Sequence, residues 1–181
     1  GIGGGGIVGQ RKAEVQEQME QRAESLRRVL VLQLAKRRGE VLALVQNETL
    51  AQALSSKPSD HNREALTRTL NRWLNGHPGD FQHVRVLQAP GGTIVGSTSQ
   101  VEIGSNFPDR LLLQRALRPG VQELIMPAIS PVGKPALAWV RQIRPPHSSD
   151  ATELRGIVVA YTEVQELLDD VLLPTGDATL F

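Results

Sequence analysis

The sequence predicts an α+β fold in which a long N-terminal helix precedes a five-stranded antiparallel sheet flanked by further helices. Three observations lead to this prediction. Apolar residues recur every three or four positions over the first part of the chain, which is the spacing of a helix face. Shorter apolar runs separated by turn formers follow, and these are typical of strands. No repeated strand–helix–strand units connect them, which favours antiparallel pairing.

Composition limits the classes of function. The chain has 181 residues, 40% of them hydrophobic, which suffices for one domain with a sizeable core. The 20 basic and 19 acidic residues leave no excess of positive charge, so we expect no nucleic-acid partner. The chain has no cysteine, which excludes disulfides and thiolate chemistry. No apolar run approaches the roughly 18 residues needed to cross a bilayer. We therefore expect membrane contact only through transmembrane segments that this chain lacks.

The glycine-rich segment 1–9, GIGGGGIVG, is expected to lie outside the folded domain, because its glycines disfavour regular structure. Two origins are open for it. It is either a remnant of an expression tag or the end of a transmembrane segment.

The long helix is predicted to occupy residues 10–54, a stretch without proline and with one glycine, Gly39. A helix of this length exceeds what a small domain can cover, so we expect its first half to project or to pair with a second copy in a homodimer. Two helices separated at Gly39 are the alternative, since one internal glycine costs only about 1 kcal/mol and does not settle the matter. One face of the predicted helix carries apolar residues at Val15, Met19, Ala23, Leu26, Leu30 and Leu34.

The remaining residues, 55–181, are predicted to form the domain itself. The segment SSKPSD ends the first helix, and Asp60 is the expected N-cap of a second helix over 61–74. The turn APGG joins the first two strands into a hairpin. The predicted strands are 81–88, 93–97, 121–129, 134–144 and 154–162, with helices at 109–117 and 163–173 and a further strand starting at 178–181.

Catalytic motifs are absent from the sequence. The four histidines, His61, His77, His83 and His147, occupy unrelated positions without the spacing of metal ligands on one helix face. There is no G-x-S-x-G nucleophile motif, and no strand precedes the N-terminal glycines as in a phosphate-binding loop. We therefore expect no catalytic residue, no cofactor and no metal ligand. A metal site assembled only in three dimensions remains open.

The order of motifs in the second half resembles a known family. The stretch VRVLQAPGGTIVGSTSQVEIGSN contains a strand, a glycine turn, a second strand and the pair Ile103-Gly104. The helix DRLLLQRAL follows, and then the strand segments LIMPAISPVGKPALAWVRQI and LRGIVVAYTEVQELLDDVL, the latter running directly into a helix. This order resembles the Cache-type (periplasmic PAS-like) sensor domains, over about residues 14–173.

The resemblance implies a function as well as a fold. It implies an extracytoplasmic, periplasmic domain of an inner-membrane receptor, which senses a small molecule and signals to a histidine kinase of a two-component system, a diguanylate cyclase or a chemoreceptor module. Such a domain is not an enzyme. The Tyr/Arg/Trp-Tyr run of amino-acid-binding members is absent, so an amino-acid ligand is not implied. The alternatives are a ligand-free dimerisation and signal-relay module, or a cytoplasmic PAS-type domain.

The candidate ligand-binding residues are those able to line a pocket over the sheet. Trp139 and Arg141 are two apart and share a strand face, and Tyr161 ends the neighbouring strand. Arg110 and Arg115 lie on the short helix that the family places over the sheet. An arginine beside an aromatic ring suits a carboxylate ligand, which it binds through paired hydrogen bonds. The alternative is that Trp139 belongs to the core and Arg141 faces solvent.

Overall fold

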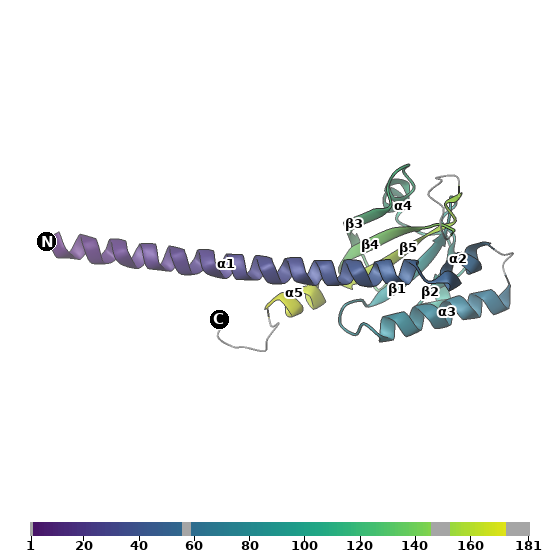
Figure 1. Ribbon diagram of the computed structural model, residues 1–181, viewed down its shortest axis with the longest axis horizontal. Coiled ribbons are helices and arrows are strands. Elements are labelled where there is room, and N and C mark those ends of the chain that lie inside the picture. The colour runs from purple at the N-terminus through teal and green to yellow at the C-terminus, as the bar shows by residue number, and fades with distance from the viewer. Residues whose placement is uncertain (1, 56–58, 146–152, 173–181) are drawn as a thin grey trace. The chain divides into compact units, whose positions relative to one another are not determined.

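The computed structural model describes residues 2–55, 59–145 and 153–172. It confirms an α+β fold with one five-stranded antiparallel sheet (Figure 1). The chain divides into two compact units, Arg37–Leu167 and a second unit of Gly1–Lys36 with Leu168–Phe181. The elements are α1 (Ile2–Val45), α2 (Glu48–Ser55), α3 (Asp60–Asn75), β1 (His83–Gln88), β2 (Ile94–Ser97), the 3-10 turn η1 (Gln100–Glu102), α4 (Arg110–Ala116), β3 (Glu123–Ile129), β4 (Pro135–Ile143), β5 (Gly156–Glu163) and α5 (Val164–Leu172).

The sheet has the strand order β2-β1-β5-β4-β3. The central strand β5 pairs with β1 on one side and β4 on the other, and all its residues are buried. Its unbroken apolar run reflects this burial on both faces. β3 pairs only with β4 and carries Pro127, a residue that strands tolerate at a sheet edge.

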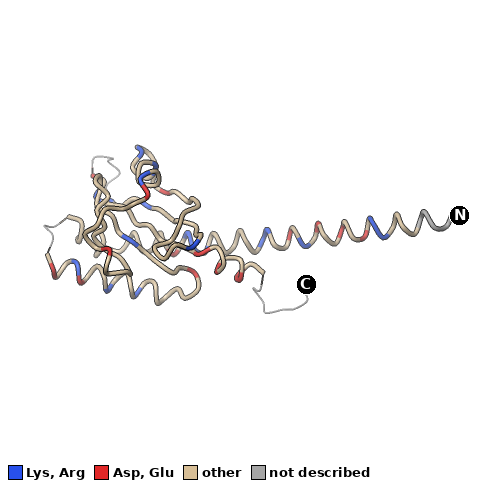
Figure 2. Tube along the Cα trace, turned by 180° about the vertical axis from the view of Figure 1, so that it is seen from behind, with Lys and Arg blue, Asp and Glu red and all other residues tan. Residues whose placement is uncertain are grey.

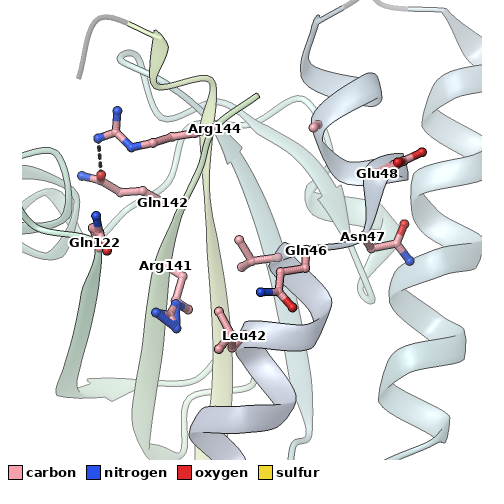
Figure 3. A pocket seen from close by; sticks show the side chains of 10 residues that line it. Leu42, Gln46, Asn47, Glu48, Gln122, Arg141, Gln142 and Arg144 are labelled. Carbon is pink, nitrogen blue, oxygen red and sulfur yellow. Dashed lines mark hydrogen bonds between the residues drawn. The ribbon is translucent and has the colours of Figure 1, made fainter. Parts of the chain in front are cut away.

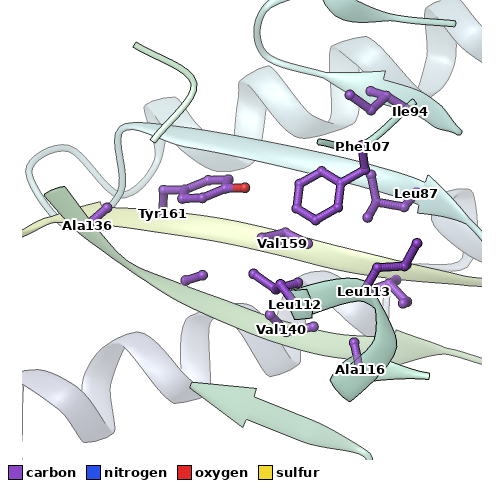
Figure 4. Packing of buried hydrophobic residues seen from close by; sticks show 12 residues of the cluster. Leu87, Ile94, Phe107, Leu112, Leu113, Ala116, Ala136, Val140, Val159 and Tyr161 are labelled. Atoms are coloured by element: carbon purple, nitrogen blue, oxygen red, sulfur yellow. The ribbon is translucent and has the colours of Figure 1, made fainter. Parts of the chain in front are cut away.

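Helices cover both faces of the sheet, which we call the α4 face and the α1 face. On the α1 face, Val41 and Leu44 of α1 are buried, and α3 packs on β1 and β2. On the α4 face, α4 lies against β3 and β4, and its apolar side chains point toward the sheet (Figure 4). The core of the α4 face consists of Leu87, Ile94, Phe107, Leu112, Leu113, Ala116, Ala136, Ala138, Val140, Ile157, Val159 and Tyr161.

The first residue of β5, Gly156, lies close to Leu87 of β1 and to Leu54 of α2. A Cβ atom there would stand 2.5 Å from the carbonyl oxygen of Leu87 and 2.6 Å from Cδ1 of Leu54. Because the first of these neighbours is backbone, any larger side chain would push the two central strands apart. Glycine is therefore required for this packing.

The first helices differ from the predicted single helix over 10–54. α1 begins at Ile2, within the glycine-rich segment, and continues through Gly39 to Val45. A separate helix, α2, starts after Asn47, whose side-chain oxygen accepts a hydrogen bond from the Thr49 amide at 2.9 Å. This cap satisfies an amide at the start of α2 and explains the break. The division into the two compact units falls within α1, between Lys36 and Arg37.

Other elements lie within two residues of their predicted bounds. The N-cap of α3 is Ser59, not Asp60: its hydroxyl accepts a hydrogen bond from the Asn62 amide at 3.1 Å. The strand expected at 178–181 lies outside the described residues. Among the residues described, no helix combines the length and the apolar character that crossing a bilayer requires.

Candidate ligand-binding site

The predicted site residues lie on different faces of the sheet. Trp139 pairs with Ala160 in the β4–β5 register, whereas Tyr161 pairs with Ala138. Because successive side chains in a strand point to opposite faces, Trp139 and Arg141 share the α1 face, as predicted, and Tyr161 lies on the α4 face. The predicted residues therefore do not converge on one pocket.

Trp139 belongs to the core. It is 2% exposed, and its ring meets that of Phe81 edge-on at 6.4 Å. Its indole Nε1 donates a hydrogen bond to Oγ1 of Thr162 at 3.0 Å, so its polar atom is satisfied by the protein. This matches the core interpretation considered for Trp139.

The two arginines of α4 face away from the sheet. The helical period turns Leu112, Leu113 and Ala116 inward and leaves Arg110 and Arg115 exposed. Arg110 makes a long hydrogen bond from Nη1 to the Gly91 carbonyl oxygen at 3.4 Å. Both arginine side chains are therefore on the solvent side of α4.

Tyr161 takes part in a buried polar cluster that includes residues outside the sequence-based prediction. Arg85 Nη1 donates to the Tyr161 hydroxyl at 3.0 Å, and Arg85 Nε and Nη2 contact the two Glu102 carboxylate oxygens at 2.8 and 2.5 Å. Ser97 Oγ donates to Glu102 Oε1 at 2.5 Å. The guanidinium carbon stands 5.5 Å from the ring centroids of both Phe107 and Tyr161. We call these residues the Arg85 cluster.

Electrostatics keep the Arg85 cluster charged. Burial raises the pKa of Glu102, but hydrogen bonds from Arg85 and Ser97 outweigh it, so that pKa lies below its usual value. Burial lowers the pKa of Arg85, but the Glu102 contact reverses the effect and raises it. Burial raises the pKa of Tyr161, which keeps its hydroxyl protonated. At neutral pH the cluster is a shielded ion pair capped by a neutral phenol.

The α4 face is consequently closed. Phe107 and Leu112 are at most 1% exposed and fill the space beneath α4 (Figure 4). The position at Arg85 that a carboxylate ligand would take is held by the carboxylate of Glu102. Side chains of the protein itself thus fill the space on the α4 face and bind the Arg85 guanidinium.

An open cleft lies on the other side of the domain, where the end of α1 meets the sheet. It has a volume of about 460 Å³, within the range of roughly 300–1,000 Å³ typical of small-molecule sites. Figure 3 shows Leu42 and Gln46 on the helix side and Arg141 on β4 across from them. The cleft is lined by Leu42, Val45, Gln46, Asn47, Glu48, Ala51, Gln122, Arg141, Gln142 and Arg144.

The charges around this cleft favour an anion. Its ionisable lining residues are Arg141, Arg144 and Glu48. Nη2 of Arg141 lies 3.6 Å from Oε2 of Glu123, but Arg38 holds Glu123 more closely, with its Nε 2.7 Å from Oε1. A guanidinium that is held only loosely by its acidic neighbour can bind a second carboxylate. Of the cleft residues, sequence reasoning identified only Arg141.

Potential metal ligands also come together. Within the described part of the chain, Glu40, His77 and Asp80 form the one group of three such residues whose donor atoms lie within 4.8 Å of one another. They come from α1 and from the turns between α3 and β1. Sequence spacing could not reveal this group, because 37 positions separate the first two residues.

Comparisons with known proteins give matches to solved structures alone. No family model matches the chain, and no curated protein sequence matches it. The sensor domain of the Vibrio cholerae histidine kinase DctB superimposes with a TM-score of 0.62 at 15% identity, over 85% of this chain and 59% of that one. The ligand-binding domain of the Pseudomonas aeruginosa PAO1 amino-acid chemoreceptor PctC, in complex with GABA, gives 0.54 at 18% identity, over 78% and 62%. The periplasmic domain of Vibrio cholerae LuxQ gives 0.57 at 13% identity, over 87% and 71%.

The chain spans only about three-fifths of the DctB and PctC domains. At identities of 13–18%, the likeness concerns the fold. The chain therefore has the sensor-domain fold that its resemblance to Cache-type domains predicted.

Proposed function

We propose that this chain is the extracytoplasmic sensing domain of a membrane-bound signal-transduction receptor, and that it binds a small carboxylate. Its fold is that of a histidine-kinase sensor domain, a chemoreceptor ligand-binding domain and a periplasmic domain. The output of the full-length receptor is then a histidine kinase, a diguanylate cyclase or a chemoreceptor module. The observation that carries the ligand proposal is the open cleft beside Arg141.

The cleft offers the groups that a carboxylate needs. Arg141 supplies a guanidinium group, which binds carboxylates through paired, charge-assisted hydrogen bonds. Arg144, which donates to Gln142 Oε1, adds positive charge to the lining. The amides of Gln46, Asn47 and Gln122 can hold polar groups on the rest of the ligand. Leu42, Val45 and Ala51 add apolar surface. A carboxylate with a short polar body fits this lining best.

The position of the cleft suggests how binding would produce a signal. One wall is the end of α1, at Leu42 and Val45, and the opposite wall is β4, at Arg141. A ligand held by both walls favours one arrangement of helix against strand. A ligand shifts a conformational equilibrium only through such a difference in affinity between two states. α1 would then carry the change toward the membrane.

A thermal-shift screen of mono- and dicarboxylates tests the ligand proposal. We expect at least one carboxylate to raise the melting temperature, and Arg141→Ala to weaken that ligand by about tenfold, or about 1.4 kcal/mol. Arg110→Ala is the matched control, since Arg110 lies exposed on α4. A ligand whose affinity is the same in the Arg141→Ala variant would refute the site.

We also propose that the chain forms a homodimer through α1. Val15 is 53% and Met19 65% exposed, and both lie on the apolar stripe that continues to Leu34. The stripe repeats every 11 residues, from Val15 to Leu26 and from Met19 to Leu30. An 11-residue repeat matches the natural pitch of a helix closely, so two copies can pack along it with little supercoiling. Acidic and basic residues are both present along the same helix (Figure 2), which lets two copies meet without strong repulsion.

Sedimentation-equilibrium measurements test this dimer. Met19→Glu places a charge on the apolar stripe and should weaken dimerisation by at least tenfold. Gln21→Glu introduces the same charge on the opposite side of the helix and should leave the association unchanged. Equal weakening by both variants would point to general repulsion and count against pairing through the stripe.

The closed α4 face favours a second candidate function, a ligand-free dimerisation and signal-relay module. On that face, the Glu102 carboxylate already binds the Arg85 guanidinium, and apolar side chains fill the remaining space. This candidate predicts that no carboxylate stabilises the protein while the α1 dimer still forms.

An alkaline phosphatase fusion placed after the domain in the full-length receptor tests the location of the domain. Phosphatase activity supports a periplasmic domain, and inactivity supports a cytoplasmic PAS-type domain.

A further inference from the structure

We propose that Glu40, His77 and Asp80 form a binding site for one divalent transition-metal ion. The three residues come from α1, from the turn after α3 and from the turn before β1. Their donor atoms, two carboxylate oxygens and one imidazole nitrogen, all lie within 4.8 Å of one another. Carboxylate and imidazole donors are typical ligands of Zn²⁺ and related ions, and three protein ligands leave a position for water.

The distances are close to those of an occupied site. Zn²⁺ binds oxygen and nitrogen at roughly 2.0–2.2 Å in tetrahedral sites, so two ligands of one ion lie about 3.4 Å apart. His77 Nδ1 already lies 3.3 Å from Glu40 Oε1, a normal separation for neighbouring ligands. The remaining separations are at most 4.8 Å and need to shorten by up to about 1.4 Å, which rotation of the Glu40 and Asp80 side chains can provide.

Surrounding contacts hold the three residues in place. The indole of Trp73 donates to the carbonyl oxygen of Glu40 at 3.1 Å, and its ring lies 5.3 Å from that of His77. The Asp80 amide donates to the His77 carbonyl oxygen at 3.1 Å. Thr162 Oγ1 donates to the Asp80 carbonyl oxygen at 2.8 Å. The ligands therefore stand on a backbone that is fixed before any ion binds, which reduces the cost of ordering them.

Arg37 reduces the net negative charge of the metal-binding group. Its side chain is fully buried, with Nε 3.2 Å from the Asp80 carbonyl oxygen and Nη2 3.8 Å from Asp80 Oδ1. Arg37 offsets part of the negative charge of the two carboxylates. A divalent ion is still attracted, but less strongly than by two uncompensated carboxylates. We therefore expect a dissociation constant in the micromolar range.

One side of the group opens to solvent. The His77 side chain is 29% exposed, compared with 13% for Glu40 and 7% for Asp80. An ion can enter past His77, and water can take the remaining coordination position there. Bound metal would tie the end of α1 to α3 and to the start of β1, which lie far apart in sequence.

Isothermal titration of the metal-free protein with Zn²⁺ tests the proposal. We expect one site per chain with a micromolar dissociation constant, and a rise in melting temperature on adding the ion. His77→Gln and Glu40→Gln keep similar volume and polarity and should each weaken binding at least tenfold. Co²⁺ should give a visible absorption band in the wild type that both variants lose.

The matched control is His83→Gln. His83 also lies near a carboxylate, with Nε2 3.8 Å from Glu163 Oε1, but it is not part of the three-ligand group. Zn²⁺ binding should survive in this variant. The proposal is overturned if the wild type binds no Zn²⁺, or if His83→Gln removes binding as fully as His77→Gln. Circular dichroism of each variant shows that loss of binding does not arise from unfolding.

Discussion

The two faces of the sheet differ in how closely other side chains bind the arginine that lies on each of them. On the α4 face, Arg85 is bound by both oxygens of Glu102 and by the Tyr161 hydroxyl. On the α1 face, Arg141 stands 3.6 Å from Glu123 and borders an open cleft. A buried arginine bound by an internal carboxylate cannot be removed without leaving that carboxylate unpaired, whereas an arginine that is loosely held beside a cleft can bind a ligand.

This contrast separates structural from functional arginines without reference to ligands. What decides is the number and distance of internal acceptors around each guanidinium, together with its exposure. By this criterion Arg85 is structural, and Arg141 is the candidate for binding.

Arg85→Ala should produce the largest loss of stability. It leaves the Glu102 carboxylate partly buried without its main partner, which costs about 3 kcal/mol or more. Urea unfolding at neutral pH measures the change in the free energy of unfolding. Arg110→Ala, on the exposed side of α4, is the control and should change it by less than about 0.5 kcal/mol. A cost below about 1 kcal/mol for Arg85→Ala would remove the proposed difference between the faces.

Glu102→Gln should have an intermediate effect that depends on pH. The pKa of Glu102 in the folded protein is lowered relative to the unfolded chain, so the carboxylate contributes stability above about pH 4.3. That contribution is lost as the pH falls through the folded pKa. We expect Glu102→Gln to cost about 2 kcal/mol at pH 7 and progressively less in acid. Urea unfolding at pH 7 and at pH 3 measures both values; equal costs at the two pH values would contradict the ionised pair.

Arg141→Ala should have the smallest effect on stability. Glu123 keeps Arg38 at 2.7 Å, so losing Arg141 leaves no carboxylate without a partner. We expect a loss of about 0.5–1 kcal/mol, as for a partly exposed ion pair. The same urea titration checks this value. A loss as large as that of Arg85→Ala would show that both arginines are structural.

Most of the fold could be predicted from the sequence, because its elements are encoded locally. Apolar runs bounded by turns such as APGG located the strands within two residues. The break between α1 and α2 depends on one capping side chain, Asn47, within an otherwise helical segment. Periodicity alone could not locate it, although an asparagine before Glu48 is a usable signal for a helix start.

The site was harder to predict, because it depends on register and on tertiary contacts. Alternation correctly placed Trp139 and Arg141 together, but only the β4–β5 register shows that Tyr161 faces the other way. The pair of Arg85 and Glu102 arises because the η1 turn folds back onto β1. Arg85, within an apolar strand and on the same face as Leu87, was a signal that could have indicated a buried charge.

The edge strand β3 has a consequence for solubility. Ile125 and Ile129 are 42% and 63% exposed on this strand, an apolar edge of the kind that recruits further strands and leads to aggregation. Pro127 lies between them, at a position whose backbone nitrogen points away from β4, as the hydrogen bond from the Ser130 amide to Lys134 establishes. Proline offers no N–H to an incoming strand there. Pro127 thus interrupts the outer row of donors, which disfavours pairing of this edge with a second copy of the sheet.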